Sequence, residues 1–295
     1  VTYNGAGSSY LWSDAQTLSG TMTLSAGTLN TGNFNYSGTQ FNYGNTTTRT
    51  LTLGSSVIQL SAVSQAWTAS NITNITITAN TASVTFSGSG SLSVAMGGLN
   101  WNGMSLVLNS TITALASGLY GTFGSITVTG GAIKTTSVRI DNPLTCTGTF
   151  AITGNSAINR ILVYSVTRGT AYTLTAAGES LTNVDFRDID AAGAAIPFTG
   201  TSIGDCLGNS DITFDTPATQ THTASAGGNW SDASKWTSRV PLPQDNVVVD
   251  VNTTGTLTAD MPRLGADVTF SGFTGTADFS SVANEIHGGL VLGSG

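Results

Sequence analysis

The chain has 295 residues, with 9 Lys or Arg and 16 Asp or Glu, and its formal net charge at pH 7 is −7. Charged residues make up 8% of the chain, against about 25% in an ordinary soluble domain. So few basic residues argue against nucleic-acid binding, because Lys and Arg must neutralise phosphates. The composition also excludes a coiled coil, and a 39% hydrophobic content argues against disorder. No run of about 18 apolar residues occurs, so we expect no membrane span.

Residues 1–140 are predicted to form a β-solenoid scaffold that is almost free of carboxylates. No Asp or Glu occurs between Ala15 and Ile140, so this part cannot hold the paired carboxylates of acid–base catalysis. Short runs alternate apolar residues with Thr or Ser, which is typical of strands with one buried face. These runs lie at residues 21–24, 50–53, 74–78, 83–86 and 125–129.

The predicted fold class is all-β, a parallel β-helix or β-solenoid of short turns rich in Thr, Ser and Gly. The runs end in Gly, Asn or Ser, which suit tight corners. Asn-Gly hairpin dipeptides are scarce, although a meander of hairpins would need them. No Pro-rich linker precedes residue 216. Tandem β-sandwiches are the alternative, since they also consist of many short strands.

Residues 141–215 are predicted to continue the β region with acidic strand faces. If one strand passes through Asp185, Asp188 and Asp190, the last two share a face and the first lies opposite. Asp188 and Asp190 then suggest a weak calcium site, because Ca²⁺ prefers oxygen ligands. The three carboxylates are also acid–base candidates for glycan cleavage. The simplest interpretation is a solvated strand face with Arg187 as a local counter-charge.

Residues 216–295 are predicted to be a module-opening segment and the start of a further β module. The segment Trp12-Ser13-Asp14-Ala15 recurs as Trp230-Ser231-Asp232-Ala233, and a Thr/Leu strand pattern follows each copy. Repeats of stacked β units are expected in solenoids. The chain opens without Met and closes within a strand pattern, so we expect a truncated module in a piece of a longer protein.

Trp230 and Trp236 lie six residues apart in a loop rich in Gly, Ser and Asp. Aromatic faces suit the flat apolar surfaces of sugars, so the two rings could form a weak glycan-stacking site. Alternatively, they cover the end of the coil or fix a module junction.

The remaining reactive residues show no catalytic or metal-binding spacing. Cys146 and Cys206 form no CxxC pair. One disulfide is permitted, but we expect two buried thiols, because a free Cys behaves as a small hydrophobe. His222 and His287 are isolated, and no phosphate-binding loop or HExxH motif occurs. We therefore expect neither a catalytic residue nor a cofactor.

Several segments resemble one family. Arg49–Ser56 followed by Ala66-Trp67, Arg168–Leu174, and Gly228–Asp232 with Trp236 resemble repeats of large β-helix proteins from tailed-bacteriophage particles, such as tail fibres and spikes, and from bacterial surface adhesins. The resemblance implies a non-enzymatic structural or adhesive protein at an extracellular or virion surface, with a cell-surface glycan as a partner. Because β-helices expose edges and ends, we expect a homo-oligomer, either a trimer or a filament. The alternative is a tailspike-type polysaccharide depolymerase, a glycoside hydrolase or lyase, that uses Asp185, Asp188 or Asp190.

Overall fold

The computed structural model describes residues 1–69, 71–94, 96, 98–117 and 119–293. Strands hold 52% of the chain and form a parallel β-solenoid of about 13 turns. Within the described residues the only helix is the 3₁₀ helix η1 (Ala233–Lys235). All pairs of named strands are parallel. This confirms the predicted solenoid and excludes tandem sandwiches, which consist of antiparallel sheets.

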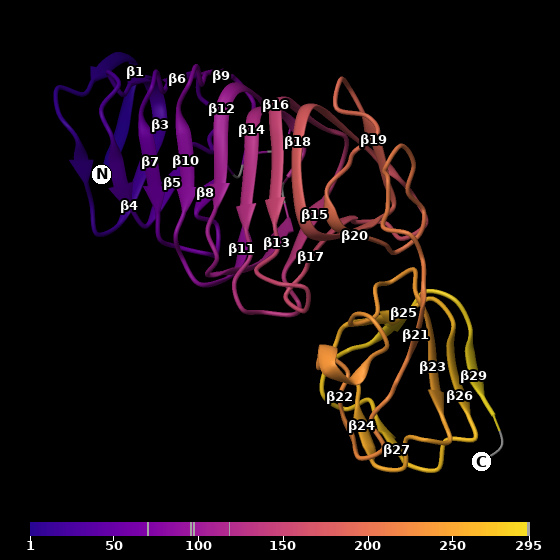
Figure 1. The fold of residues 1–295 in the computed structure, drawn as a ribbon. Helices are drawn as coiled ribbons and strands as arrows, with labels where there is room; N and C mark the ends of the chain where they lie inside the picture. The colour runs from indigo at the N-terminus through magenta and orange to yellow at the C-terminus, as the bar shows by residue number, and fades with distance from the viewer. Residues whose placement is uncertain (70, 95, 97, 118, 294–295) are drawn as a thin grey trace.

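The solenoid consists of two coils, which we call the first coil (residues 1–215) and the second coil (residues 216–293) (Figure 1). The strands of the first coil are β1 (Thr2–Leu11), β2 (Gln16–Thr17), β3 (Thr21–Asn30), β4 (Tyr36–Gly38), β5 (Gln40–Asn42), β6 (Arg49–Thr52), β7 (Val57–Leu60), β8 (Trp67–Thr68), β9 (Ile75–Thr78), β10 (Ser83–Phe86), β11 (Gly90–Ser93), β12 (Asn100–Leu108), β13 (Ile112–Ser117), β14 (Gly121–Thr129), β15 (Ser137–Ile140), β16 (Leu144–Thr153), β17 (Ile161–Ser165), β18 (Tyr172–Arg187), β19 (Ile189–Ala192) and β20 (Thr201–Asp205). Those of the second coil are β21 (Thr219–Thr221), β22 (Gly227–Asn229), β23 (Asn246–Asp250), β24 (Thr256–Thr258), β25 (Arg263–Gly265), β26 (Val268–Ser271), β27 (Thr276–Asp278), β28 (Glu285–Ile286) and β29 (Leu290–Leu292).

Each turn of the first coil lies in register on the turn before it. One sheet has the order β8-β5-β3-β6-β9 with β1 beside β3, and a 14-stranded sheet runs from β2 through β10 and β18 to β11. The long strand β18 pairs with β16 along its first part and with β17 at its end, so it bends around a corner of the coil. Register partners lie between 17 positions apart (Tyr172 and Ile189) and 30 positions apart (Leu144 and Leu174). The turns are therefore of unequal length.

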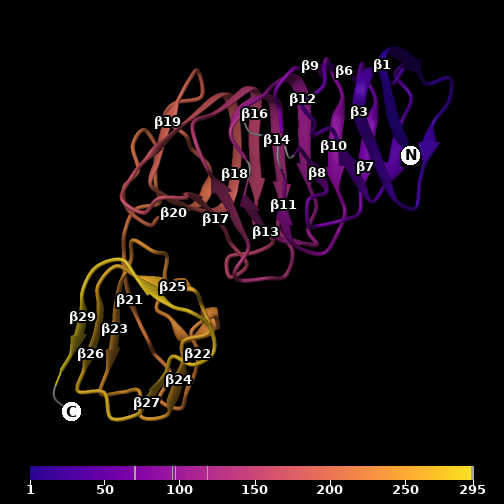
Figure 2. The same ribbon diagram turned by 180° about the vertical axis from the view of Figure 1, so that it is seen from behind.

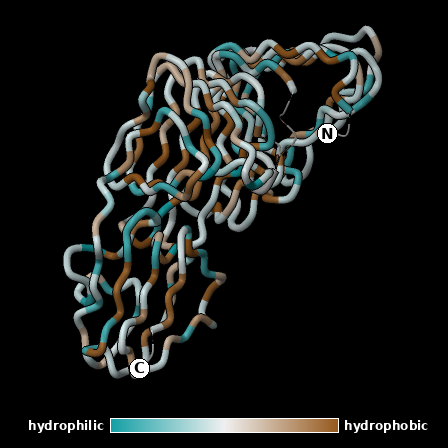
Figure 3. The backbone as a smooth tube through the Cα atoms, turned by 90° about the vertical axis from the view of Figure 1, so that its right-hand side faces the viewer, coloured by the Kyte–Doolittle hydropathy of each residue, from teal (hydrophilic) through white to brown (hydrophobic). Residues whose placement is uncertain are grey.

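The predicted alternation places apolar side chains in continuous columns inside the coil. In β10, Val84 and Phe86 are buried, whereas Ser83 and Thr85, which alternate with them, are only partly buried. Val84 is in register with Ile58 of one neighbouring turn and Leu106 of the other. Figure 3 shows hydrophobic residues along the strands of both coils. Stacked apolar side chains from successive turns thus build the core.

Aromatic residues extend these columns through the first coil. Phe41 and Trp67 are register partners, and their rings stack with centroids 4.9 Å apart. Trp101 meets the edge of Trp67 at 5.5 Å. Offset and edge-to-face contacts of this kind stabilise a core by more than their buried area.

The corners use Gly and Asn as the sequence predicts. Gly54 has φ +60°, a left-handed conformation that favours Gly. A Cβ at Gly54 would lie 2.2 Å from Oδ1 of Asn33. That oxygen accepts a hydrogen bond from the backbone N–H of Ser55 at 3.0 Å. Asn33 itself has φ +67°, so one corner side chain supports the corner of the next turn.

The second coil has its own core and three short sheets, β21-β23-β26-β29, β22-β24-β27 and β25-β28. None of its named strands pairs with a strand of the first coil. Figures 1 and 2 show it beside the last turns of the first coil rather than stacked on them. Side chains, not a shared sheet, must therefore hold the two coils together.

The two Trp-Ser-Asp-Ala segments occupy equivalent places in the two coils. The backbone N–H of Trp12 donates to the carbonyl of Asn30 at 3.1 Å, and that of Trp230 donates to the carbonyl of Thr258 at 2.8 Å. In each case the tryptophan follows a strand that pairs with the strand ending at the acceptor. The short sequence repeat therefore corresponds to a structural one.

Both cysteines are free and buried, which confirms the prediction of two buried thiols. Burial raises the pKa of Cys146 to about 12 and also raises the pKa of Cys206. Neither thiol is a nucleophile at neutral pH in this state, because only the thiolate reacts.

Arg49 is a buried cation in the carboxylate-free region. Its Nε donates to the carbonyl of Tyr43 at 2.8 Å, Nη1 donates to the carbonyls of Thr47 and Thr73, and Nη2 donates to that of Asn71 at 3.1 Å. Burial lowers the pKa of Arg49. Carbonyl dipoles from two turns thus take the place of a carboxylate.

We expect Arg49→Met to lower the free energy of unfolding of the first coil by about 2–4 kcal/mol, because several buried carbonyls lose their donor. Urea unfolding followed by tryptophan fluorescence measures the loss. Arg139→Met is the control, because Arg139 is partly exposed and paired with Asp141, a kind of pair that contributes about 1 kcal/mol or less. Equal losses in the two variants would contradict a special role for Arg49.

Candidate functional site

The two coils meet at a buried carboxylate that lies between two arginines. Asp185, near the end of β18, has no solvent exposure. Its Oδ1 accepts from Nε and Nη2 of Arg160 at 2.8 and 2.5 Å, and its Oδ2 accepts from Nε of Arg263 at 2.5 Å. Arg160 precedes β17 in the first coil, whereas Arg263 opens β25 in the second. A single side chain of the first coil therefore binds the second coil directly.

Local structure explains how Asp185 becomes buried. Its neighbours Val184 and Phe186 belong to the core of the first coil, so Asp185 points to the opposite side of the strand, which the second coil covers. Gly204 of β20 is its register partner. A Cβ at Gly204 would lie 2.0 Å from Oδ1 of Asp185 and 2.8 Å from Cδ of Pro243. Only glycine leaves room there for the carboxylate and the second coil.

The arginines keep Asp185 charged. Burial by itself would raise the pKa of Asp185, but the positive charges of Arg160 and Arg263 and their hydrogen bonds lower it. Arg160 is held further by Ser202, whose hydroxyl and carbonyl accept at 2.6 and 2.8 Å. Asp185 is therefore a fixed anion at neutral pH and has no proton to donate as a general acid.

Other polar contacts surround this centre. Arg187 donates through Nη1 to both oxygens of Glu285, at 3.2 and 3.3 Å, and its guanidinium carbon lies 5.0 Å from the ring centroid of Tyr164. Lys134 contacts Asp260 at 2.5 Å. These pairs again join the first coil to the second.

Gln244 makes a further bridge between the coils. Its side-chain nitrogen donates to the carbonyls of Ile203 and Asp215, at 3.1 and 3.0 Å. Its side-chain oxygen accepts from the backbone N–H of Asp205 at 2.9 Å. The junction thus combines ion pairs with hydrogen bonds to backbone groups.

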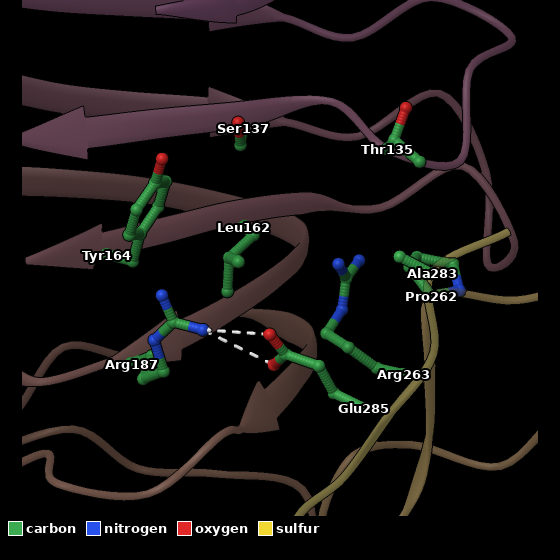
Figure 4. Close-up of a pocket in the computed structure, with 9 residues that line it drawn as sticks. All are labelled: Thr135, Ser137, Leu162, Tyr164, Arg187, Pro262, Arg263, Ala283 and Glu285. Atoms are coloured by element: carbon green, nitrogen blue, oxygen red, sulfur yellow. Dashed lines mark hydrogen bonds and ion pairs between the residues drawn. The ribbon is translucent and has the colours of Figure 1, made fainter. Parts of the chain in front are cut away.

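A pocket of about 260 Å³ opens between the coils beside these contacts. Figure 4 shows the side chains that line it, from strands and loops of both coils. They are Thr135, Ser137, Leu162, Tyr164 and Arg187 from the first coil and Pro262, Arg263, Ala283 and Glu285 from the second. The junction therefore has both a closed centre and an open side.

The structure separates the three predicted acidic residues. The expectation of one strand through Asp188 is wrong, because β18 ends at Arg187, β19 begins at Ile189, and Asp188 forms the corner between them with φ +55°. Oδ2 of Asp188 accepts from the backbone N–H of Gly169 at 3.0 Å, and Asp190 accepts from the hydroxyl of Ser210. Within the described residues no group of three or more His, Cys, Asp or Glu side chains gathers to hold a metal ion. The weak calcium site at Asp188 and Asp190 therefore receives no further ligand of these types there.

The two tryptophans of the predicted glycan site lie inside the second coil. Trp230 has no exposure and Trp236 has 5%. Their ring centroids are 4.8 Å apart, and Nε1 of Trp236 donates to the carbonyl of Trp230 at 2.7 Å. Since a sugar needs an open aromatic face, this arrangement agrees with the alternative that the rings fix the opening of the module.

The junction residues Arg160, Arg263 and Glu285 were not predicted. Asp185 is 25 positions from Arg160 and 78 from Arg263, and no local spacing reveals such pairs. The one signal in the sequence is the crowding of charge after Ile140.

No protein-family model, curated protein or solved structure matches this chain. Across the described residues, no helix has the length and apolar character needed to cross a membrane.

Asp185→Asn keeps the shape of the side chain but removes the charge between the two arginines. We expect the free energy of unfolding to fall by about 3–5 kcal/mol, because a buried cation loses its partner. Urea denaturation measures the change, with separate probes for the two coils. Asp190→Asn is the matched control, since Asp190 is only partly buried, and it should cost under about 1 kcal/mol. An unchanged midpoint for the Asp185 variant would show that the ion pairs do not hold the junction.

The two histidines make the stability of the second coil depend on pH. Burial lowers the pKa of His222, whose Nδ1 lies 2.8 Å from the hydroxyl of Thr253, and burial also lowers the pKa of His287. The unfolded chain then binds more protons than the folded chain once the pH falls below the ordinary value of 6.5. Folding stability is therefore full above that value and decreases as the pH falls through it towards the lowered pKa values.

We expect the thermal midpoint of the second coil to decrease between pH 7.5 and pH ~5, where few carboxylates titrate. Calorimetry of the wild-type chain and of the double variant His222→Asn/His287→Asn measures the slope. The double variant should show a flatter profile. Identical slopes for the two proteins would assign the pH dependence to other groups.

Proposed function

We propose that this chain is a non-enzymatic structural or adhesive part of a surface fibre, on a phage particle or a bacterial surface. The observation that carries the proposal is the buried Arg160–Asp185–Arg263 contact between two parallel β-coils. Such a contact fixes the angle between the coils, because any rotation would separate buried charges. A long coil whose successive turns are joined by backbone hydrogen bonds, and whose bend is fixed, suits a shaft that holds other parts at a distance.

The phage or adhesin assignment is supported by the resemblance of the repeated segments. Self-association is part of the same proposal. The strand edges and ends that a β-coil exposes favour pairing with another chain, in keeping with a trimer or filament.

Three measurements test the shaft. We expect small-angle scattering to fit two coils with one fixed angle, trypsin to leave the folded chain largely intact, and sedimentation to show a homo-oligomer. The Asp185→Asn variant should scatter as a mixture of angles. A wild-type chain with freely reorienting coils would overturn the proposal.

The depolymerase alternative makes the opposite biochemical prediction. Asp185 is saturated by two arginines, and Asp188 and Asp190 bond separately to Gly169 and Ser210. We therefore expect no new reducing ends or unsaturated sugars when the purified chain is incubated with bacterial capsular polysaccharides. Cleavage that Asp188→Asn or Asp190→Asn abolishes would establish the enzyme instead.

A further inference from the structure

The junction gathers an unusual share of the positive charge. Four of the seven arginines belong to two clusters of ion pairs there, Arg160 and Arg263 with Asp185, and Arg168 and Arg187 with Glu285. The two clusters contain three carboxylates, those of Asp185, Asp188 and Glu285. Together they carry one positive charge in excess, and this excess lies in the cluster of Asp185, although the whole chain has a net charge of −7.

The pocket lies on the open side of these ion pairs. The arginine nitrogens there that have no hydrogen-bond partner are donors. The side chain of Arg263 is 6% exposed and bonds to Asp185 through Nε. In the part of the chain that the structure describes, its Nη1 has no hydrogen-bond partner. Figure 4 shows this guanidinium directed into the pocket. Nε of Arg187 is also buried without a hydrogen-bond partner.

Hydroxyl groups line the facing wall. Thr135, Ser137 and Tyr164 come from the first coil, and no hydrogen bond engages their side-chain oxygens among the described residues. The one carboxylate of the pocket, Glu285, already accepts both bonds from Arg187 and lies 3.9 Å from Arg168. A ligand therefore has to supply acceptors for arginine and partners for hydroxyl groups.

The size and walls of the pocket restrict the ligand further. A volume of about 260 Å³ lies just below the usual range of small-molecule sites, which suits one sugar ring rather than an oligosaccharide. Leu162, Pro262 and Ala283 offer apolar surface to the C–H groups of such a ring. Arginine favours carboxylates because its planar fork matches their geometry.

We infer that this pocket binds a single carboxylated sugar, a uronic acid unit. The carboxylate lies at Nη1 of Arg263 and balances the excess charge, and the ring hydroxyls bond to Thr135, Ser137 and Tyr164. The inference goes beyond the structural function proposed above, since a rigid shaft needs no ligand. Because both coils line the pocket, the ligand also connects them, and binding stabilises the junction.

Titration calorimetry on the wild-type chain tests the site with sodium D-glucuronate as the probe. Glucose has the same ring hydroxyls without the charge, and sulfate has charge without the ring. We expect glucuronate to bind at least 10-fold more tightly than either, and its affinity to decrease with added salt. Equal binding of sulfate means an adventitious ion only, and equal binding of glucose removes the role of Arg263. Either result, or no binding of glucuronate, overturns the inference.

Two variants locate the site without disturbing the ion pairs. Ser137→Ala and Tyr164→Phe each remove one hydroxyl, and we expect affinity for glucuronate to fall about 2–10-fold, the value of one hydrogen bond. Ser83→Ala is the matched control, because Ser83 opens β10 with the same burial pattern that Ser137 has in β15. If all three variants bind as the wild type does, the ligand lies elsewhere. If the wild-type chain in that case still scatters as two coils with one fixed angle and still resists trypsin, the proposed shaft function is unaffected.

Discussion

Each turn of a parallel coil can satisfy its backbone only through the turns on either side, and this constraint governs where charge occurs. Inward side chains lie over equivalent ones, as Val84 does over Ile58 and Leu106, so the interior column must be apolar at every level. A carboxylate placed there would have no charged or hydrogen-bonding partner on the turn above or the turn below. Residues 15–140, which form most of the first coil, accordingly contain none. Arg49, a buried cation in this stretch, obeys the same constraint, because four backbone carbonyls accept its hydrogen bonds.

The pairing of stacked strands stops where the second coil begins, so the junction between the coils depends on a different interaction. With no strand pairing across it, the contact must come from side chains, and Asp185 is the buried carboxylate at its centre. Moving a carboxylate out of water costs several kcal/mol unless cations and hydrogen bonds replace the water. Arg160 supplies a cation and hydrogen bonds from the same coil, and Arg263 supplies them from the other coil. Separating the coils would leave charges without partners, so the ion pairs define one relative position of the coils more than they add net stability.

The fold could be predicted from the sequence much further than the site. Alternation at residues 83–86 or 125–129 is a local property, because burial of one strand face is decided residue by residue. The partners of Asp185 are not local, since they lie 25 and 78 positions away. Asp188 was expected to continue a strand, but its left-handed backbone forms a corner, which Asp tolerates better than most residues. Trp230 and Trp236 were open to two interpretations because spacing in a loop does not show which way a ring points.

The same arginine can hold the junction and face a ligand because its guanidinium offers several donors in one plane. Arg263 uses Nε for Asp185 and Nη2 for the carbonyl of Arg160, which leaves Nη1 on the side of the pocket. A lysine would place one compact charge at Asp185 and present no fixed donor to the pocket. The excess positive charge follows from the same arrangement, since a carboxylate held by two arginines neutralises only one of them. A junction built to keep Asp185 buried therefore leaves one cationic group for an anion, and the hydroxyls of Ser137 and Tyr164 decide which anion fits.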